Sequence, residues 1–389
     1  MGKNYKGSRK YISSKLLSRQ RIVNYNLKII NKVVDDLIVE LSNKNVISDK
    51  LTNKIQISHL KIALILTYGY EINDLNLSNE IIHVENEITK VRSHIQNIQD
   101  YLPFPIRNLW NLFSNYKSAS NSLSLKREKY LNKFHLYTLE QFNSNKNLSL
   151  FVKNSLMFNY FKNDLNKIST AEIKSICLTM VSAGLDNVAL NFKFGIYMLS
   201  KYSNFWENIY LNLIKPFNNN SKLAYDNLIN DNNFSCQYLI ACIKEILRLF
   251  SVLPMALPRE TTGPINYKNC LIPKGTTLFM NCWSGNHDFK KFKSPMIFNP
   301  NRYLNESGQL NQLNHLSFGS GSRKCLGDQL ANYELYILLA KFILKFKPVN
   351  ASALVPLQEE NSLILNKYPF SLAIEPDDFT IELINRNSS

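Results

Sequence analysis

The segment FGSGSRKCLG, residues 318–327, constrains this chain more than any other, because it leads a glycine-rich loop through a cysteine into the start of a helix. Cys325 follows the basic pair that begins at Arg323, and both a basic neighbourhood and a helix N-terminus favour the thiolate form of a cysteine. Gly319 and Gly321 permit tight turns and the close approach of a flat ligand. The pattern predicts a cysteine presented to a ligand; the alternative is a buried structural cysteine in a glycine-rich turn.

The composition is that of an ordinary globular protein. Of the 389 residues, 45% are hydrophobic and 20% are charged, which is too apolar a balance for wholesale disorder. The six cysteines form no CxxC pair, so zinc ribbons and thioredoxin-type redox sites are disfavoured. A mean hydropathy of −0.20 and the lack of an uninterrupted long apolar run argue against a membrane-spanning helix within the chain.

The net charge of +16 raises the question of an acidic partner. The basic residues are scattered along the whole chain and form no tight cluster, so nucleic-acid binding is disfavoured. A positive surface suits an anionic membrane or an acidic protein. The alternative is a lysine- and asparagine-rich composition spread over solvated faces.

Hydrophobic periodicity predicts a mainly helical chain with a small β portion late in the sequence. Ser169 and Glu172 form the pattern of a capping box, and the apolar run that follows, residues 176–199, predicts a central buried helix. Residues 217–234 are polar and predict a loop. Other helices are predicted at residues 23–41, 57–68, 81–98, 125–142, 236–250 and 328–346, and strands in TTLFMNCW (276–283), FSLAIEP (370–376) and FTIEL (379–383). No linker separates independent parts, so residues 1–389 are expected to form a single domain.

The cysteine loop resembles the haem-binding signature of the cytochrome P-450 family, FxxGxRxCxG. All fixed positions are filled, by Phe318, Gly321, Arg323, Cys325 and Gly327. The resemblance implies haem b as the cofactor and the Cys325 thiolate as the ligand of its iron. In this loop Phe318 is expected to shield the sulfur from water, and Gly319 and Gly327 to let the backbone and the following helix approach the haem ring.

Two further segments resemble the structural network that the family builds around this loop. Glu245 and Arg248 lie three residues apart in the apolar run LIACIKEILRLF, where both charges are costly unless they pair. They match the ExxR motif, and Arg302 in FNPNRYL matches the arginine that joins the pair. The resemblance implies that the three residues form a buried network that locks the cysteine loop. The alternatives are an exposed ExxR helix and an ordinary turn.

The sequence AGLDN, residues 183–187, resembles the family motif [AG]GxDT, the groove in which oxygen lies above the iron. A glycine inside a helix costs about 1 kcal/mol relative to alanine, and room for a diatomic ligand is the expected reason for Gly184 next to Ala183. Asp186 is expected to relay protons. Asn187 stands where the family usually has threonine. An amide holds a water but is no acid, which leaves open an oxygen-independent isomerase or dehydratase.

Haem propionates require cations, and three arginines are candidates. Arg323 is one by its position in the motif. Arg259, in LPRE, falls where the family often has a propionate-binding arginine after the ExxR helix. Arg9 ends YKGSR, residues 5–9, which resembles the family's WxxxR with tyrosine in place of tryptophan. The alternative for Arg9 is an exposed basic N-terminus.

The resemblance covers essentially the whole chain but not the whole fold of the family. Members normally carry an N-terminal membrane anchor and a sheet before the WxxxR helix, whereas Arg9 is almost the first motif here. The expectation is a cytochrome P-450 fold that lacks its N-terminal anchor and sheet, with the strands after Ile265 left without partners. An anchor upstream would place the protein at the endoplasmic reticulum membrane. The chain as given would be cytoplasmic, with peripheral membrane association as an alternative.

The segments LPRETT, NHD and LANYELY read like fungal phenylacetate-hydroxylase-type members of the family. The resemblance implies a monooxygenase that inserts one oxygen atom from O2 into a small organic substrate, in this sub-family an aromatic carboxylic acid. Electrons would come from NADPH through a flavin-containing reductase, to which the basic surface is suited to dock. The alternatives are a haem-binding or non-functional fragment, and an oxygen-independent enzyme of the family.

Overall fold

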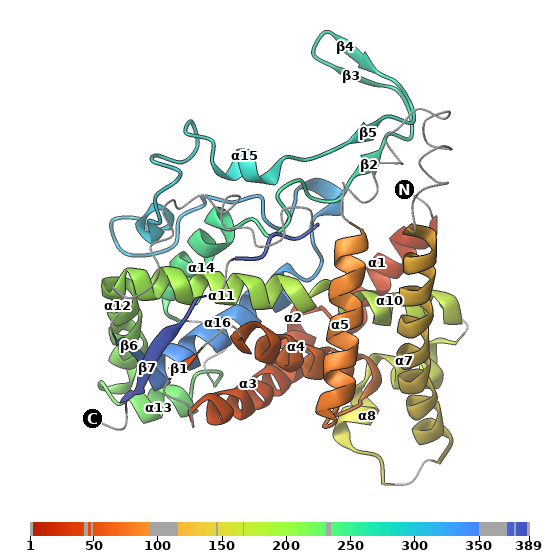
Figure 1. Ribbon diagram of the computed structural model, residues 1–389, viewed down its shortest axis with the longest axis horizontal. Helices are drawn as coiled ribbons and strands as arrows, with labels where there is room; N and C mark the ends of the chain where they lie inside the picture. Colours follow the sequence, from red (N-terminus) through yellow and green to blue (C-terminus); the bar gives the residue numbers. More distant parts are fainter. Residues whose placement is uncertain are drawn as a thin grey trace.

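The computed structural model describes residues 3–42, 46–47, 50–92, 116–144, 147–165, 167–230, 235–349, 372–376 and 379–386, and most of these residues are helical (Figure 1). The mainly helical fold with a small β portion, predicted from hydrophobic periodicity, is confirmed.

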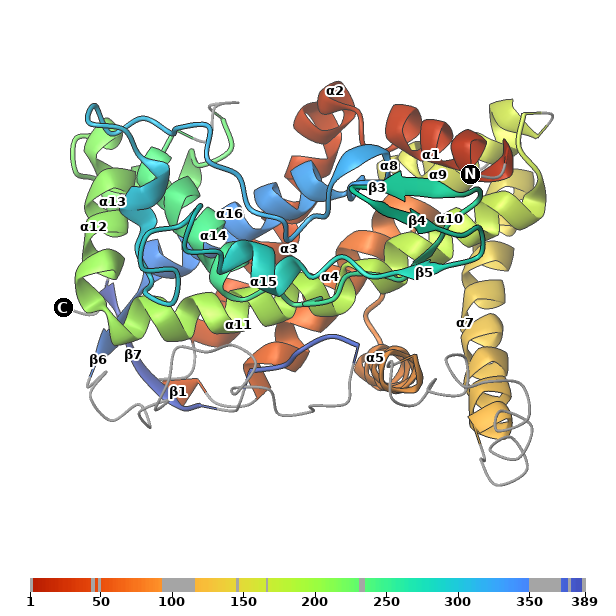
Figure 2. The same cartoon turned by 90° about the horizontal axis from the view of Figure 1, so that it is seen from above.

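A long helix crosses the middle of the molecule in both views (Figures 1 and 2). It consists of α10 (Thr170–Ala183) and α11 (Leu185–Lys201), which meet at Gly184. The predicted capping box begins it: the Glu172 N–H donates to the Ser169 hydroxyl at 3.2 Å, and the Ser169 N–H donates to the Glu172 carboxylate at 3.1 Å. Most side chains of α11 are buried, as expected of a helix that is apolar nearly all round.

The same run, Thr170–Lys201, also has the length and hydropathy that a membrane-spanning helix needs, although the sequence argued against such a helix. Length and composition do not distinguish a membrane span from a buried core helix. In the structure α11 packs against α4 (Lys50–Tyr68) and α16 (Asp328–Lys345), which are the surroundings of a core helix.

A helix bundle forms where α3 (Leu27–Ser42) packs against α4 and α16. The apolar residues of α3 recur every three or four positions, so they bury one face of the helix. Lys341 of α16 is buried in this bundle and forms an ion pair with Asp35 of α3. Its ammonium also lies 4.3 Å from the centre of the Tyr225 ring. The buried charge is therefore compensated, as the cost of desolvating it requires.

The remaining helices surround this bundle. Along the chain they are α1 (Lys3–Lys15), α2 (Arg19–Arg21), η1 (Ile22–Asn26), α5 (Leu75–Val91), α7 (Tyr116–Ser144), α8 (Leu150–Asn154), α9 (Leu156–Asn159), η3 (Tyr160–Asp164), α12 (Ser203–Ile214), η4 (Lys215–Phe217), α13 (Ser221–Asp226), α14 (Gln237–Leu249), α15 (Cys282–Asn286), η5 (Pro300–Tyr303) and η6 (Gly321–Arg323).

The loop predicted at residues 217–234 is wrong in part, because it contains α13. The Asn220 side chain caps this helix by accepting the Leu223 N–H at 2.9 Å. Tyr225 then donates its hydroxyl to Asp35 at 2.7 Å, which ties the short helix to the bundle. Asparagine favours helix caps as well as loops, so composition alone did not reveal the helix. Residues 231–234 lie outside the described residues.

The strands after Ile265 have partners, contrary to expectation, because they pair with one another. β3 (Ile265–Tyr267) and β4 (Cys270–Ile272) form an antiparallel hairpin, and β2 (Arg259–Glu260) pairs with β5 (Thr277–Leu278). The hairpin projects from the body of the molecule (Figure 1). A third sheet joins segments far apart in the chain, in the order β1 (Val46–Ile47), β7 (Ile381–Asn385) and β6 (Phe346–Val349).

Three predicted strands differ from those that the structure has in the described residues. In TTLFMNCW only Thr277–Leu278 is a strand, because the Asn281 side chain accepts the Ser284 N–H at 2.8 Å and begins α15. Residues 372–376 of FSLAIEP form no named strand, and in FTIEL the strand β7 begins at Ile381.

The capping box gives a test of how the central helix begins. Ser169→Ala removes one partner of a reciprocal pair, so we expect the free energy of unfolding to fall by about 1 kcal/mol. Ser175→Ala, at an exposed position of the same helix, should be neutral or slightly stabilising because alanine is the better helix former. Urea unfolding followed by circular dichroism measures both. An equal effect of the two substitutions would contradict the role of the cap.

Candidate active site

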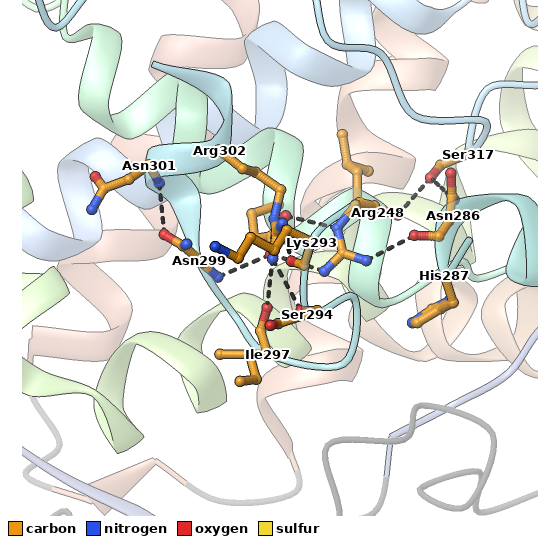
Figure 3. A network of polar contacts seen from close by, with 12 residues as sticks. Arg248, Asn286, His287, Lys293, Ser294, Ile297, Asn299, Asn301, Arg302 and Ser317 are labelled. Atoms are coloured by element: carbon orange, nitrogen blue, oxygen red, sulfur yellow. Dashed lines mark hydrogen bonds and ion pairs between the residues drawn. The ribbon is translucent and has the colours of Figure 1, made fainter. Parts of the chain in front are cut away.

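The structure brings Glu245, Arg248 and Arg302 together in one buried network (Figure 3). The first two lie one turn apart on α14, and both are 0% exposed. Nε and Nη2 of Arg248 donate to the two carboxylate oxygens of Glu245 at 2.8 and 2.9 Å. Nε of Arg302, on η5, donates to the same carboxylate at 3.0 Å. Two guanidinium groups therefore share one buried carboxylate.

Arg302 also organises the loop that precedes it. Its Nη1 donates to the carbonyl of Lys293 at 2.8 Å, and its Nη2 to the carbonyls of Ser294 at 3.3 Å and Ile297 at 3.1 Å. The backbone N–H of Asn299 donates to Glu245 at 2.9 Å. A single arginine thus donates to three backbone carbonyls of this loop.

Asn286, at the end of α15, connects the network to the cysteine loop. Nη1 of Arg248 donates to the Asn286 carbonyl at 2.8 Å. The Asn286 side chain accepts the Leu316 N–H at 2.7 Å and donates to the Ser317 hydroxyl at 3.1 Å. Ser317 in turn donates to the carbonyl of Leu247 at 2.5 Å. The network therefore ends on the two residues that precede Phe318.

Asn286 and Ser317 were missed as site residues by the sequence reasoning. Asn286 is the first residue of the NHD segment, which was considered only for its resemblance to a sub-family. Its burial, at 0% exposure, is the signal that a polar side chain at that position has partners.

The cysteine loop is held by turns that only glycine adopts easily. Gly319 and Gly321 have φ angles of +76° and +68°. The Cys325 N–H donates to the Phe318 carbonyl at 2.8 Å and so closes the loop. A Cβ atom at Gly319 would lie 3.7 Å from the methyl carbon of Met280, so the backbone conformation, rather than a clash, requires glycine there.

Cys325 itself is exposed, whereas four of the six cysteines are buried. Desolvation by the surrounding protein raises the pKa of its thiol, and the N–H of Gly327 and the charges of Arg9 and Lys324 lower it only in part. The Gly327 N–H at the helix start and the Lys324 charge therefore act in the expected direction, and desolvation opposes them in the protein alone. A bound metal cation deprotonates a coordinating thiol outright. The thiolate form of Cys325 would therefore depend on a bound metal.

Two of the three predicted arginines lie at the cysteine loop. Arg9, on α1, donates from Nη2 to the carbonyl of Lys324 at 2.5 Å and from Nη1 to the Tyr5 hydroxyl at 3.2 Å. The Arg323 guanidinium stacks 3.9 Å from the centre of the Tyr5 ring. The tyrosine that replaces tryptophan in the YKGSR segment thus joins both arginines, and α1 docks on the loop through them.

The third arginine, Arg259, has a buried donor to spare. Its Nη1 has no hydrogen-bond partner among the described residues. Arg259 pairs with Leu278 across the β2–β5 ladder. Met280, two residues after Leu278, has its methyl carbon near Gly319 of the cysteine loop. A buried guanidinium N–H group without a partner is suited to bind an anionic group.

The AGLDN segment lies at the break between α10 and α11. Nδ2 of Asn187 donates to the Ala183 carbonyl at 2.6 Å, and Ala183 is exposed. The Asp186 carboxylate accepts from Nε2 of Gln56 at 2.9 Å and from the Thr89 hydroxyl at 3.2 Å. Burial raises the pKa of Asp186 above its ordinary value despite these donors.

The reason expected for Gly184 is wrong. A Cβ atom there would lie 2.1 Å from Nε2 and 2.2 Å from Cε1 of His59, so the space left by the missing side chain is filled by an imidazole ring. It does not provide room for a diatomic ligand. Ala183, the neighbour of Gly184, is exposed to solvent instead.

The network predicts a specific defect when its carboxylate is removed. Glu245→Ala leaves two buried arginines without an anion, so we expect a loss of roughly 3–5 kcal/mol in unfolding free energy. Backbone N–H groups in residues 316–325 should also exchange faster with solvent. Arg127→Ala is the matched control, because it breaks another buried pair, that of Arg127 with Glu85. An unchanged exchange rate in Glu245→Ala, or an equal increase in the control, would show that the network does not hold the loop.

Comparison with known proteins places this geometry in a family. A family profile described as Cytochrome P450 matches residues 2–374. The chain is 33% identical over 328 residues to a phenylacetate 2-hydroxylase of Emericella nidulans, covering 83% of this chain and 60% of the relative. It is 29% identical over 338 residues to a 3-hydroxyphenylacetate 6-hydroxylase of the same organism, covering 86% and 61%. It is 32% identical over 290 residues to the cytochrome P450 monooxygenase CYP3 of Mycosarcoma maydis, covering 72% and 51%. The chain thus spans between one half and two thirds of the length of these relatives. The resemblance carried by the cysteine loop is confirmed, and the chain belongs to the cytochrome P450 family.

Proposed function

We propose that this chain is the haem-thiolate portion of a monooxygenase that hydroxylates a small organic substrate. The observation that carries the proposal is the exposed Cys325 at the end of a loop that a buried network fixes from behind. A structural cysteine in a glycine-rich turn needs no such network and would be buried. Relatives named as hydroxylases or monooxygenases support the same reaction class.

The residues present fit haem b. Cys325 supplies one exposed sulfur, and Phe318 and the two positive-φ glycines shape the loop around it. Arg9, Arg323 and the unmatched Nη1 of Arg259 are suited to the two propionates. When bound through a thiolate, haem supplies oxygen activation and favours O–O cleavage.

The break of the central helix is suited to delivering protons. Asp186 holds a proton at its carboxyl more readily than an exposed aspartate, because burial raises its pKa. Asn187 commits Nδ2 to the Ala183 carbonyl, which leaves Oδ1 free to accept a hydrogen bond from a water. In this proposal Asp186 gives up the proton and Asn187 positions the water that passes it on.

Electrons are proposed to come from NADPH through a flavin-containing reductase. The net charge of +16 favours association with an acidic partner. Lys324 beside the cysteine loop remains half-exposed even though it pairs with Asp328 at 2.6 Å. If the whole protein carries an N-terminal anchor, these steps would take place at the endoplasmic reticulum membrane.

The proposed substrate is a small aromatic carboxylic acid. Phenylacetate and 3-hydroxyphenylacetate are named for two relatives, each of which shares about three tenths of its aligned residues with this chain. Sub-family resemblance is the whole of the support, so the substrate must be tested separately from the reaction.

The reaction is tested by isotope labelling. Haem-loaded protein, NADPH, a reductase and phenylacetate are incubated under ¹⁸O2, and one labelled atom is expected in the product. Cys325→Ala should form none, because the sulfur ligand is lost. Cys270→Ala, which removes the other exposed cysteine, should retain wild-type product. Product formed equally without O2 would support an oxygen-independent enzyme. No product from haem-loaded wild type with any compound that shifts the haem spin state would support a non-functional fragment.

The substrate class is tested by spectral titration. Phenylacetate and its hydroxylated analogues should shift the spin state of ferric haem, because a bound substrate displaces water from the iron. Long-chain fatty acids and sterols serve as controls of larger size and different shape. A response to these controls, with none to aromatic acids, would overturn the proposed substrate and leave the proposed reaction standing.

A further inference from the structure

His59 occupies the side of the central helix that Gly184 leaves open. Its ring lies where a Cβ of residue 184 would be, at 2.1 Å from Nε2. His59 is 6% exposed, and Nε2 has no hydrogen-bond partner among the described residues. A titratable ring is therefore packed against the one residue that interrupts the helix.

Glu334 holds this ring from the opposite side. Nδ1 of His59 lies 2.9 Å from Oε1 and 3.2 Å from Oε2 of Glu334, which is 1% exposed. Burial alone lowers the pKa of His59, but the carboxylate outweighs it and raises the pKa above its ordinary value. Nδ1 lies in the position to donate to this carboxylate.

One face of α4 contacts the helix break at two points. Gln56 and His59 lie three positions apart on α4, so they share a face. Gln56 donates to Asp186 at 2.9 Å, while His59 packs on Gly184. The charge of His59 also acts on Asp186 and lowers its pKa against the effect of burial. His59 therefore acts on Gly184 through packing and on Asp186 through its charge.

We propose that His59, held by Glu334, is a positioning residue that fixes the helix break at Gly184 and the carboxyl of Asp186. The proposal rests on the proposed function for its catalytic consequence but not for its geometry. Glu334 belongs to α16, the helix that begins directly after the cysteine loop. The pair therefore joins that helix to the segment proposed to deliver protons.

The alternative is that the His59–Glu334 pair only contributes to core packing. Buried ion pairs often contribute little net stability, so their presence alone shows no role. The two readings differ in whether Gly184 and His59 depend on each other and in whether the pair affects proton delivery.

The first test is a double-mutant cycle on thermal unfolding, which needs no activity. Gly184→Ala should lower the melting midpoint by about 2 °C or more, because the new methyl group collides with His59. In the His59→Ala background the same substitution should leave the midpoint unchanged or raise it, because alanine favours helix and the clash is gone. Equal effects of Gly184→Ala in both backgrounds would overturn the proposed contact.

The second test measures product formed per NADPH consumed in His59→Gln and Glu334→Gln. Both should lower this ratio several-fold while the content of bound haem stays at the wild-type level. Lys341→Met is the matched control, because it removes another buried charge from α16, that of the Asp35 pair, far along the helix from Glu334. It should lower the melting midpoint without changing the ratio. If the ratio of product to NADPH is unchanged in both variants, or falls equally in the control, the His59–Glu334 pair only fills the core. If wild type forms no product, the proposed function fails, and the unfolding cycle still decides the contact.

Discussion

The structure depends on one buried carboxylate. Glu245 is surrounded by apolar residues of α14 and would be costly there as a lone charge. Sharing it between Arg248 and Arg302 removes that cost and commits the remaining guanidinium N–H groups to backbone carbonyls. The Asn286 carbonyl lies at the end of α15, and the carbonyls that Arg302 binds lie in the loop of residues 293–297. One anion thus organises this loop and, through Asn286, the residues that precede Phe318 of the cysteine loop.

A second buried network lies at the central helix and follows similar physics. His59 and Glu334 compensate each other, and the ring of His59 requires glycine at position 184. The helix that carries Glu334 begins just after the cysteine loop, so α16 contacts both networks. These two networks hold a loop and a helix break, whereas the apolar bundle supplies most of the packing.

The sequence predicted what depends on local pattern. The ExxR spacing placed Glu245 and Arg248 on one face, and the capping box at Ser169 began the central helix as expected. Contacts between distant segments were not predictable. Nothing near Gly184 in the chain indicates that His59 fills its open side, and the strands after Ile265 pair with each other through a turn that composition does not reveal. At Cys325 the sequence shows the local charges but not the desolvation that opposes them.

The central claim is that this loop presents Cys325 as a thiolate ligand of haem iron. The most direct measurement is the absorption spectrum of the dithionite-reduced wild-type protein with carbon monoxide. Thiolate ligation predicts the strongly red-shifted carbonyl band. Haem bound at one equivalent with a carbonyl band at the unshifted position of nitrogen or thiol ligation would contradict the account.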